Sequence, residues 1–246
     1  MRNIKLTIEY DGTNYLGWQR QPRGRSIQQA IEEALAKIIG ESPSLIGSGR
    51  TDAGVHALGQ VANFFTSSLL SPSRLQMALN SLLPEDIVIV HAEEVAVDFH
   101  AQFCAVSKTY IYRIPNRPYP PALDRLRVWH VVPPLDVGTM GRCAELFLGT
   151  HDFKAFALSG RTPKTTVREV KRIEVEKQEG GSIVVEVEAD GFLRGMVRLM
   201  VGALVGAGRG IISDEDIERL LKTGSRTHLV RKAPSHGLYL KEVNYG

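Results

Sequence analysis

The chain has 246 residues, of which 43% are hydrophobic and 23% are charged. These values are typical of a globular protein with a substantial core, and they exclude a small scaffold that depends on disulfides. No apolar run is long enough to span a membrane, and the N-terminus lacks the apolar stretch of a signal peptide. Since the two cysteines, Cys104 and Cys143, lie far apart, we expect a cytoplasmic protein in a reducing compartment.

The net charge of +3 is small, but the charges are segregated along the chain. Residues 219–241 contain six Lys or Arg and no Asp or Glu, and residues 101–135 contain five basic residues and one acid. Arg20, Arg23 and Arg25 cluster in one short segment. Such segregation indicates a basic face for a polyanion, although solvated loops without a special function would give the same pattern.

The first half alternates predicted strands and helices. Residues 3–9 alternate apolar and polar side chains, which predicts a half-buried strand. Ser26 and Gln29 predict a capping box for a helix that ends at Gly40. Further elements are a strand at 58–65, a helix at 71–82 that Pro84 stops, and a strand at 87–90. The predicted order is β-α-β-α-β.

The second half repeats this alternation with longer strands. Alternating apolar and charged residues on either side of Gly180-Gly181 predict a hairpin. The predicted elements are strands at 108–114, 128–132, 167–177, 182–190 and 238–243, with helices at 136–148, at 192–205 and after Ser213. Together they predict an α+β fold with a largely antiparallel central sheet and helices on one face. We divide the chain into halves 1–105 and 106–246, which share element order but not sequence.

One glycine-rich loop carries candidate chemistry. Residues 47–56 read Gly-Ser-Gly-Arg-Thr-Asp-Ala-Gly-Val-His, so three glycines flank Arg50 and Asp52. Glycine permits unusual backbone conformations and lets a large ligand approach the main chain. A phosphate loop would continue with Gly-Lys-Ser/Thr, and a calcium loop would carry several acids at alternating positions. The loop therefore presents one carboxylate beside one arginine, and an Asx-turn or helix cap is the structural alternative.

Five blocks of the sequence resemble the tRNA pseudouridine synthase A family, in the family's order. The most specific is Gly49-Arg50-Thr51-Asp52-Ala53-Gly54-Val55-His56-Ala57. The others are Tyr10-Asp11-Gly12-Thr13 with Gly17-Trp18-Gln19-Arg20, then Lys108-Thr109-Tyr110-Ile111-Tyr112-Arg113, Gly191-Phe192-Leu193-Arg194-Gly195-Met196-Val197-Arg198 and Ala233-Pro234-Ser235-His236-Gly237-Leu238-Tyr239-Leu240. At Gly195 the chain departs from the polar side chain that the family often carries.

The resemblance implies a pseudouridine synthase fold with two pseudo-related halves around a catalytic cleft. It also implies an isomerase that converts uridines at positions 38, 39 and 40 of the tRNA anticodon stem-loop to pseudouridine. Asp52 would be the nucleophile, and no cofactor would be needed. An Asp, with a reference pKa near 3.9, is ionised at neutral pH and needs no general base. Whether it attacks ribose or uracil stays open.

The resemblance assigns roles to four other residues. Arg198 would pair with the carboxylate of Asp52 and hold it ionised. Tyr110 would stack on the target uracil, and Leu238 would line its pocket. Arg50 would fill the space left by the everted base or grip the RNA backbone. Each has a plainer interpretation, because an Arg can reach solvent or pair with an acid and a Tyr or Leu in a strand can belong to the core.

The resemblance further implies tRNA as partner, held by the basic segments, and a homodimer with the tRNA lying across both subunits. The seven histidines and two cysteines show no metal-ligand spacing, so we expect no metal. Two other functions stay open. An inactive RNA-binding relative would have replaced Asp52 or Tyr110, and a hydrolase or phosphotransferase with an aspartyl nucleophile would carry further acids for magnesium.

Overall fold

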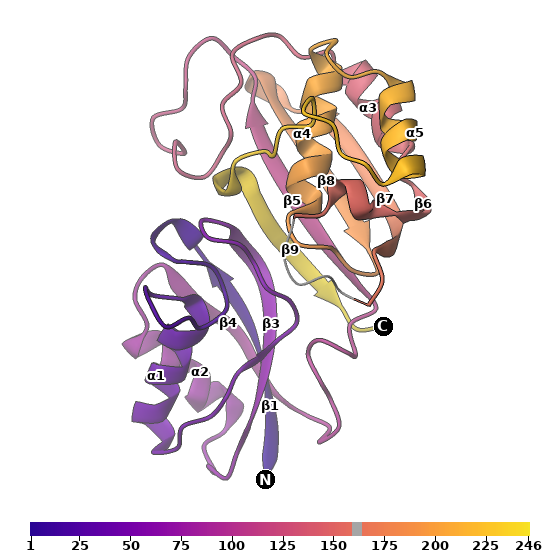
Figure 1. Cartoon of the computed structure of the whole chain (residues 1–246). Coiled ribbons are helices and arrows are strands. Elements are labelled where there is room, and N and C mark those ends of the chain that lie inside the picture. Colours follow the sequence, from indigo (N-terminus) through magenta and orange to yellow (C-terminus); the bar gives the residue numbers. More distant parts are fainter. Residues whose placement is uncertain (159–163) are drawn as a thin grey trace. The chain divides into compact units, whose positions relative to one another are not determined.

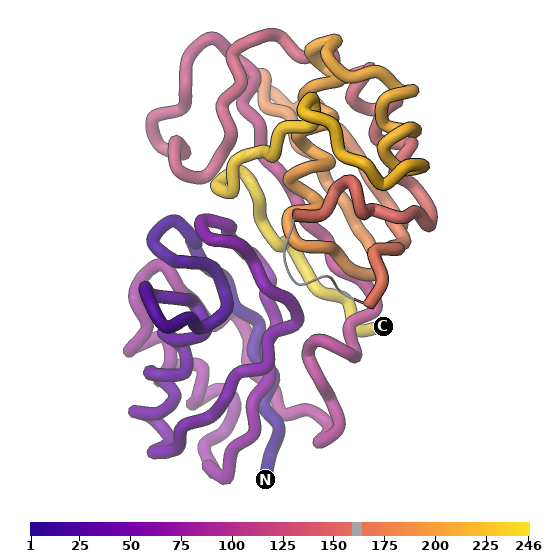
Figure 2. The backbone as a smooth tube through the Cα atoms, viewed as in Figure 1, coloured from indigo at the N-terminus to yellow at the C-terminus, as the bar shows by residue number. Residues whose placement is uncertain are grey.

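The computed structural model describes residues 1–158 and 164–246. It divides into two compact units, the first formed by Met1–Val106 with Tyr239–Gly246 and the second by Ser107–Leu238. Figure 1 shows the elements of each unit, and Figure 2 follows the backbone through them. The division of the chain into two functional domains, 1–105 and 106–246, remains a prediction.

The sheet of the first unit has the strand order β4-β1-β3-β9, with the short strand β2 paired to β3. β1 runs antiparallel to both of its neighbours. The pairing of β3 with β9 is parallel and joins His56 to Tyr239 and Ala57 to Leu240. The strands are β1 (Arg2–Tyr10), β2 (Ile46–Gly47), β3 (His56–Thr66), β4 (Ile87–Val95) and β9 (Leu238–Asn244).

Two helices, α1 (Ile27–Ile39) and α2 (Pro72–Leu82), lie together on one side of this sheet (Figure 1). Both follow the predicted periodicity. The predicted capping box is only half correct, because the Ser26 side chain accepts from the Gln29 amide while the Gln29 side chain donates to Glu33. A short 3-10 helix, Gly12–Asn14, follows β1.

The second unit contains the antiparallel strand order β5-β8-β7-β6, covered on one face by three helices (Figure 1). The strands are β5 (Ser107–Pro115), β6 (Gly149–Asp152), β7 (Val167–Lys177) and β8 (Ser182–Ala189). The helices are α3 (Val137–Glu145), α4 (Met196–Gly208) and α5 (Asp214–Thr223), with 3-10 turns at Phe153–Phe156, Glu179–Gly181 and Ser235–Gly237. The α+β class and the mainly antiparallel pairing are confirmed.

Two predicted elements of the second unit are wrong in extent. Residues 128–132 form no strand but an isolated parallel bridge between Val131 and Asn116, and the prolines that follow prevent its extension toward the C-terminus. The helix predicted from residue 192 begins only at Met196. Gly195 precedes it with φ +73°, a left-handed conformation that ends any helical run through residues 192–194.

Within the described ranges 1–158 and 164–246, no helix has the length and apolar character needed to cross a membrane.

Candidate active site

Asp52 lies in the segment between β2 and β3, on a turn that is closed by a hydrogen bond to the backbone carbonyl of Asp52. The amide of Val55 donates to the Asp52 carbonyl oxygen at 3.2 Å. Gly54, within this turn, has φ +74°, which only glycine adopts without strain. The Asp52 side chain is half-buried, and Arg50, two residues earlier, is exposed. The turn thus holds the backbone that carries the carboxylate.

A second loop packs backbone to backbone against this turn. Gly17 has φ +93°, and a Cβ there would lie 2.4 Å from the Thr51 carbonyl oxygen. A Cβ on Gly12 would lie 2.0 Å from the carbonyl oxygen of Val55. The amide of Trp18 donates to the Thr51 carbonyl at 3.2 Å, and the amide of Gly54 donates to the Tyr15 carbonyl at 3.3 Å. The first motif of the chain therefore holds the Asp52 turn on both sides.

Thr51, the residue before Asp52, is also fixed through its side chain. Its hydroxyl oxygen lies 2.8 Å from the phenol oxygen of Tyr10 at the end of β1. Burial raises the pKa of Tyr10 to about 12, although the hydrogen bonds to Thr51 and Gln60 act in the opposite direction. The phenol is therefore protonated throughout the neutral range and supplies a stable hydrogen-bond partner.

His56 anchors the end of the loop where β3 begins. Its ring is buried and stacks on the ring of Tyr239 with centroids 4.8 Å apart. Nδ1 of His56 accepts from the Gly12 amide at 3.1 Å and also lies 3.0 Å from Oδ1 of Asp11. Because Nδ1 either accepts or donates, it satisfies one of these two neighbours at a time. Both neighbours belong to the loop that packs on the Asp52 turn.

The start of the loop is held by Gln60 from β3. Its amide nitrogen donates to the Gly49 carbonyl at 3.1 Å, and its amide oxygen accepts from the Ser48 hydroxyl at 2.7 Å. The Ser48 amide donates to the Val61 carbonyl at 2.8 Å. The segment is therefore fixed before and after Asp52, and the carboxylate sits on preorganised backbone.

In the second unit, Arg198 is fixed within α4. It is 9% exposed, and its Nε donates to the Ala233 carbonyl at 2.8 Å, while the Ala233 amide donates to the Arg198 carbonyl at 3.0 Å. One turn later, a Cβ on Gly202 would lie 1.7 Å from the Arg231 carbonyl oxygen. The helix thus touches the segment 231–233 directly, and this contact orients the guanidinium of Arg198.

The charge of Arg198 acts on the segment that leads to Leu238. Burial, assisted by Arg198, lowers the pKa of His236. Tyr112 donates its hydroxyl to the Pro234 carbonyl at 2.7 Å, and a Cβ on Gly237 would lie 2.6 Å from the Tyr112 ring. Leu238 is buried at the start of β9. Two of the predicted residues, Arg198 and Leu238, thus flank one well-packed segment.

Tyr110 lies on β5 opposite Val187 of β8. Its ring is buried and meets the ring of Phe192 edge to face, with centroids 5.0 Å apart and planes at 82°. Phe192 comes from the same sequence block as Arg198. An edge-to-face neighbour fixes the orientation of an aromatic ring. The stacking of Tyr110 on a uracil therefore stays a prediction.

The five predicted site residues belong to different units: Asp52 and Arg50 to the first, and Tyr110, Arg198 and Leu238 to the second. The ion pair between Asp52 and Arg198 therefore stays a prediction. Within residues 1–158 and 164–246, no group of three His, Cys, Asp or Glu side chains could hold a metal ion.

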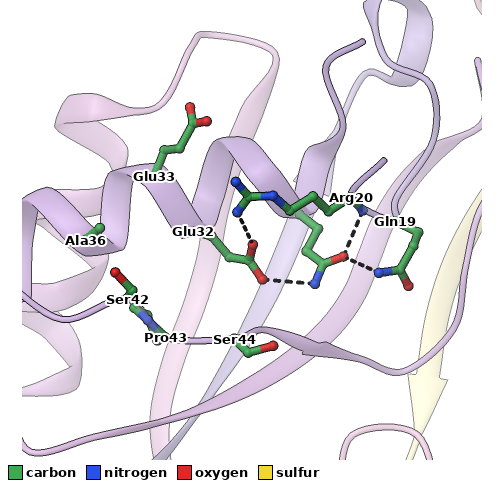
Figure 3. A pocket seen from close by; sticks show the side chains of 9 residues that line it. Gln19, Arg20, Glu32, Glu33, Ala36, Ser42, Pro43 and Ser44 are labelled. Carbon is green, nitrogen blue, oxygen red and sulfur yellow. Dashed lines mark hydrogen bonds and ion pairs between the residues drawn. The ribbon is translucent and has the colours of Figure 1, made fainter. Parts of the chain in front are cut away.

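Three polar residues near the segment that carries Asp52 were given no role from the sequence: Tyr10 binds Thr51, and Gln28 and Glu32 bind Leu45 before β2. Gln28 and Glu32 line a cavity of about 480 Å³ in the first unit, beside Arg20 (Figure 3). A signal was present, because Gln28 and Glu32 are polar residues one turn apart next to the apolar face of a predicted helix. Their partners, apart from each other, lie in the segments before and after the helix.

Comparison with known proteins agrees with these motifs. A family described as tRNA pseudouridine synthase matches residues 6–104 and 143–246. The chain is 51% identical to tRNA pseudouridine synthase A 2 of Clostridium perfringens and 48% identical to tRNA pseudouridine synthase A of Acetivibrio thermocellus, over 245 residues and 100% of both chains in each case. A chain of a solved Cbf5-Nop10-Gar1 complex is 14% identical with a TM-score of 0.32, over 82% of this chain and 54% of that one. The chain belongs to the tRNA pseudouridine synthase A family.

Proposed function

We propose that this tRNA pseudouridine synthase acts on uridines 38, 39 and 40 of the anticodon stem-loop, with Asp52 as its nucleophile. The observation that carries the proposal is the Asp52 turn, which is held by backbone contacts from the Gly12–Trp18 side and lies inside the matched family region. A carboxylate on fixed backbone is suited to a reaction in which placement, not activation, is the protein's task.

The reaction breaks the bond between ribose C1′ and uracil N1 and forms a bond between C1′ and C5. The base turns between the two steps, C5 loses its proton and N1 gains one, so atoms and electrons balance within the substrate. No redox partner or group donor enters this balance. A carboxylate can provide the nucleophile at neutral pH because its reference pKa is near 3.9.

The remaining site residues have proposed roles that fit their surroundings. Arg198, oriented by its contact with Ala233, would pair with the Asp52 carboxylate and keep it ionised. Tyr110, braced by Phe192, would stack on the everted uracil above Leu238. Arg50 is exposed and would fill the gap left in the RNA stack.

The substrate would be held mainly by its phosphates. The exposed segment after β5 contributes Arg117 and Arg125, and the segment after α5 contributes Arg231 and Lys232. Binding through such contacts weakens steeply with salt. We also propose a cytoplasmic homodimer with the tRNA lying across both subunits, which sedimentation of the protein with and without tRNA would test.

Pseudouridine mapping in tRNA transcripts tests the proposal. Incubation with the wild-type chain should produce pseudouridine at positions 38, 39 and 40 wherever a uridine stands there, with no change in RNA length. An Asp52→Ala variant should bind tRNA and produce none. Modification confined to other positions would contradict the site assignment, and equal product from both proteins would contradict the role of Asp52. Bound tRNA without any product would favour an RNA-binding relative, and phosphate release would favour a hydrolase.

A further inference from the structure

Two buried polar side chains on α1, Gln28 and Glu32, are 7% and 8% exposed. They lie one helical turn apart, and the Gln28 amide nitrogen donates to Oε1 of Glu32 at 2.9 Å. Buried polar groups are costly unless they are hydrogen-bonded, so the partners of this pair indicate what it holds.

The side-chain amide of Gln28 makes hydrogen bonds to two separate segments, the one at residues 19–20 and the one at Leu45. Its amide oxygen accepts from the Arg20 amide at 2.9 Å and from the Gln19 side chain at 2.8 Å. Its amide nitrogen donates to the Leu45 carbonyl at 3.1 Å as well as to Glu32. Figure 3 shows Gln19, Arg20 and Glu32 converging at this point.

Glu32 completes the same arrangement. Its Oε1 accepts from the Leu45 amide at 3.0 Å, and its Oε2 pairs with the Arg20 guanidinium at 3.1 Å. Both backbone groups of Leu45 are therefore bound by side chains of one helix, as they would be by a neighbouring strand. Charge-assisted bonds of this kind are among the stronger ones in proteins.

Both of the held segments lead to the Asp52 turn. Leu45 directly precedes β2, which runs into the loop that carries Asp52. The Gln28 side chain holds Gln19 and Arg20, which directly follow Trp18 in the chain. The backbone amide of Trp18 donates to the Thr51 carbonyl at 3.2 Å, and the backbone amide of Gln28 donates to the Trp18 carbonyl at 3.0 Å, a bond that does not involve the Gln28 side chain. Helix α1 is thus linked to the segment before Asp52 in two ways, through Leu45 and the chain that follows it, and through Trp18 and its hydrogen bond to Thr51.

We propose that Gln28 and Glu32 are positioning residues for the Asp52 carboxylate, acting through Leu45 on one route and through Trp18 on the other. This inference rests on the proposed function, because it assigns a purpose to the placement of Asp52. Loss of the pair would let the turn shift, while Arg117, Arg125, Arg231 and Lys232, the residues proposed to hold the tRNA phosphates, are not among the described residues that form hydrogen bonds or ion pairs with either side chain. A displacement of about 1 Å can cost up to about a hundredfold in rate.

The chain provides a matched control one residue further along α1. Gln29 donates to Oε1 of Glu33 at 2.8 Å, with the same chemistry and the same spacing. Glu33 is exposed, and the hydrogen bond between the two side chains faces solvent. Substitutions in the two pairs therefore alter the same residue types in the same helix, but only Gln28 and Glu32 bind the segments leading to Asp52.

The test compares Gln28→Met with Gln29→Met, and Glu32→Gln with Glu33→Gln, by kcat and KM for tRNA corrected for the folded fraction. We expect Gln28→Met to lower kcat about tenfold with KM within about twofold, because the turn is displaced while RNA contacts persist. Glu32→Gln keeps an acceptor for the Leu45 amide and should lower kcat about threefold. The two control variants should match wild type.

The inference is overturned if Gln28→Met keeps the wild-type kcat per folded molecule, or if only KM changes. Should Gln28→Met fail to fold, Glu32→Gln decides, and a kcat equal to that of Glu33→Gln overturns the inference. A wild-type chain that forms no pseudouridine, or an active Asp52→Ala variant, would instead contradict the proposed function. Slow exchange of the Trp18 amide in wild type, accelerated in Gln28→Met, would support the route through Thr51.

Discussion

The phenol oxygen of Tyr10 and the hydroxyl oxygen of Thr51 are 2.8 Å apart, and Thr51 directly precedes Asp52. Tyr10 ends β1, the strand paired to both β3 and β4, so this hydrogen bond ties the Asp52 turn to a strand that is paired on both sides. The ring of Tyr10 is buried in the core, and its hydroxyl alone faces the turn.

Tyr10→Phe should therefore affect both stability and rate. Removing the hydroxyl leaves Thr51 without its partner, which should lower the free energy of unfolding by about 1 kcal/mol. The kcat should fall severalfold while KM for tRNA is unchanged. Urea unfolding and initial rates measure the two effects, and Tyr119→Phe is the control because Tyr119 is 79% exposed. Identical kcat values for both variants would contradict the role of the hydroxyl.

Gly17→Ala should disturb the turn through a backbone clash. A Cβ at Gly17 would lie 2.4 Å from the Thr51 carbonyl oxygen, at φ +93°. Gly40 has φ +69° but an open surrounding, so Gly40→Ala measures backbone strain alone. We expect Gly40→Ala to cost about 1 kcal/mol with normal kcat, and Gly17→Ala to cost more and to lower kcat. Thermal unfolding and rates distinguish them, and equal kcat for both would contradict the account.

Gly195 adopts a backbone conformation that favours glycine at the entry to α4. It directly precedes α4 with φ +73°, and a Cβ there would lie 2.7 Å from Cδ1 of Leu158. Gly195→Asn should therefore destabilise the protein by about 1–2 kcal/mol, even though Asn tolerates this conformation. The double variant Gly195→Asn/Leu158→Ala should lose less free energy of unfolding than the sum of the losses in the two single variants, because the smaller side chain removes the clash. Gly210→Asn is the control, since Gly210 has φ +67° and open space around it.

The free energy of unfolding should fall at alkaline pH because the buried phenol of Tyr10 resists ionisation. Burial raises the pKa of Tyr10 to about 12, so the folded state holds the phenol proton more tightly than the unfolded state, whose pKa is near 10. The contribution is complete below pH 10 and is lost as the pH rises from 10 to 12. Urea unfolding at pH 9 and pH 11 should show a smaller decrease for Tyr10→Phe than for wild type. An equal decrease would place the effect on other tyrosines.

Much of the fold follows from local patterns. The helix Pro72–Leu82 begins at Ser71-Pro72 and ends before Pro84, as predicted, and the strand Val167–Lys177 ends where its alternation ends before Gly180-Gly181. The start of α4 could not be read, since Phe192 and Leu193 continue the apolar spacing of the helix although the backbone of Gly195 is left-handed. The strand β6 was not predicted, because its four residues carry too short a pattern.

For the candidate site, the sequence predicted the family and the candidate nucleophile but not the side chains that bind the neighbouring segments. The motif around Asp52 identified the family, and the comparisons confirm that membership. The hydrogen bonds of Tyr10, Gln28 and Glu32 were not predicted, because their partners Thr51 and Leu45 lie outside the element that carries each side chain. Side chains of this kind become recognisable only once the topology has brought their segments together.

Release of tritium from tRNA labelled at uracil C5 tests the central claim most directly. Wild type should release tritium to water as C5 exchanges its proton for the bond to C1′. Asp52→Asn keeps the shape of the side chain but not its charge, and it should release tritium at least about a thousandfold more slowly with unchanged tRNA binding and melting temperature. Release by Asp52→Asn at the wild-type rate would contradict a nucleophilic role for this carboxylate.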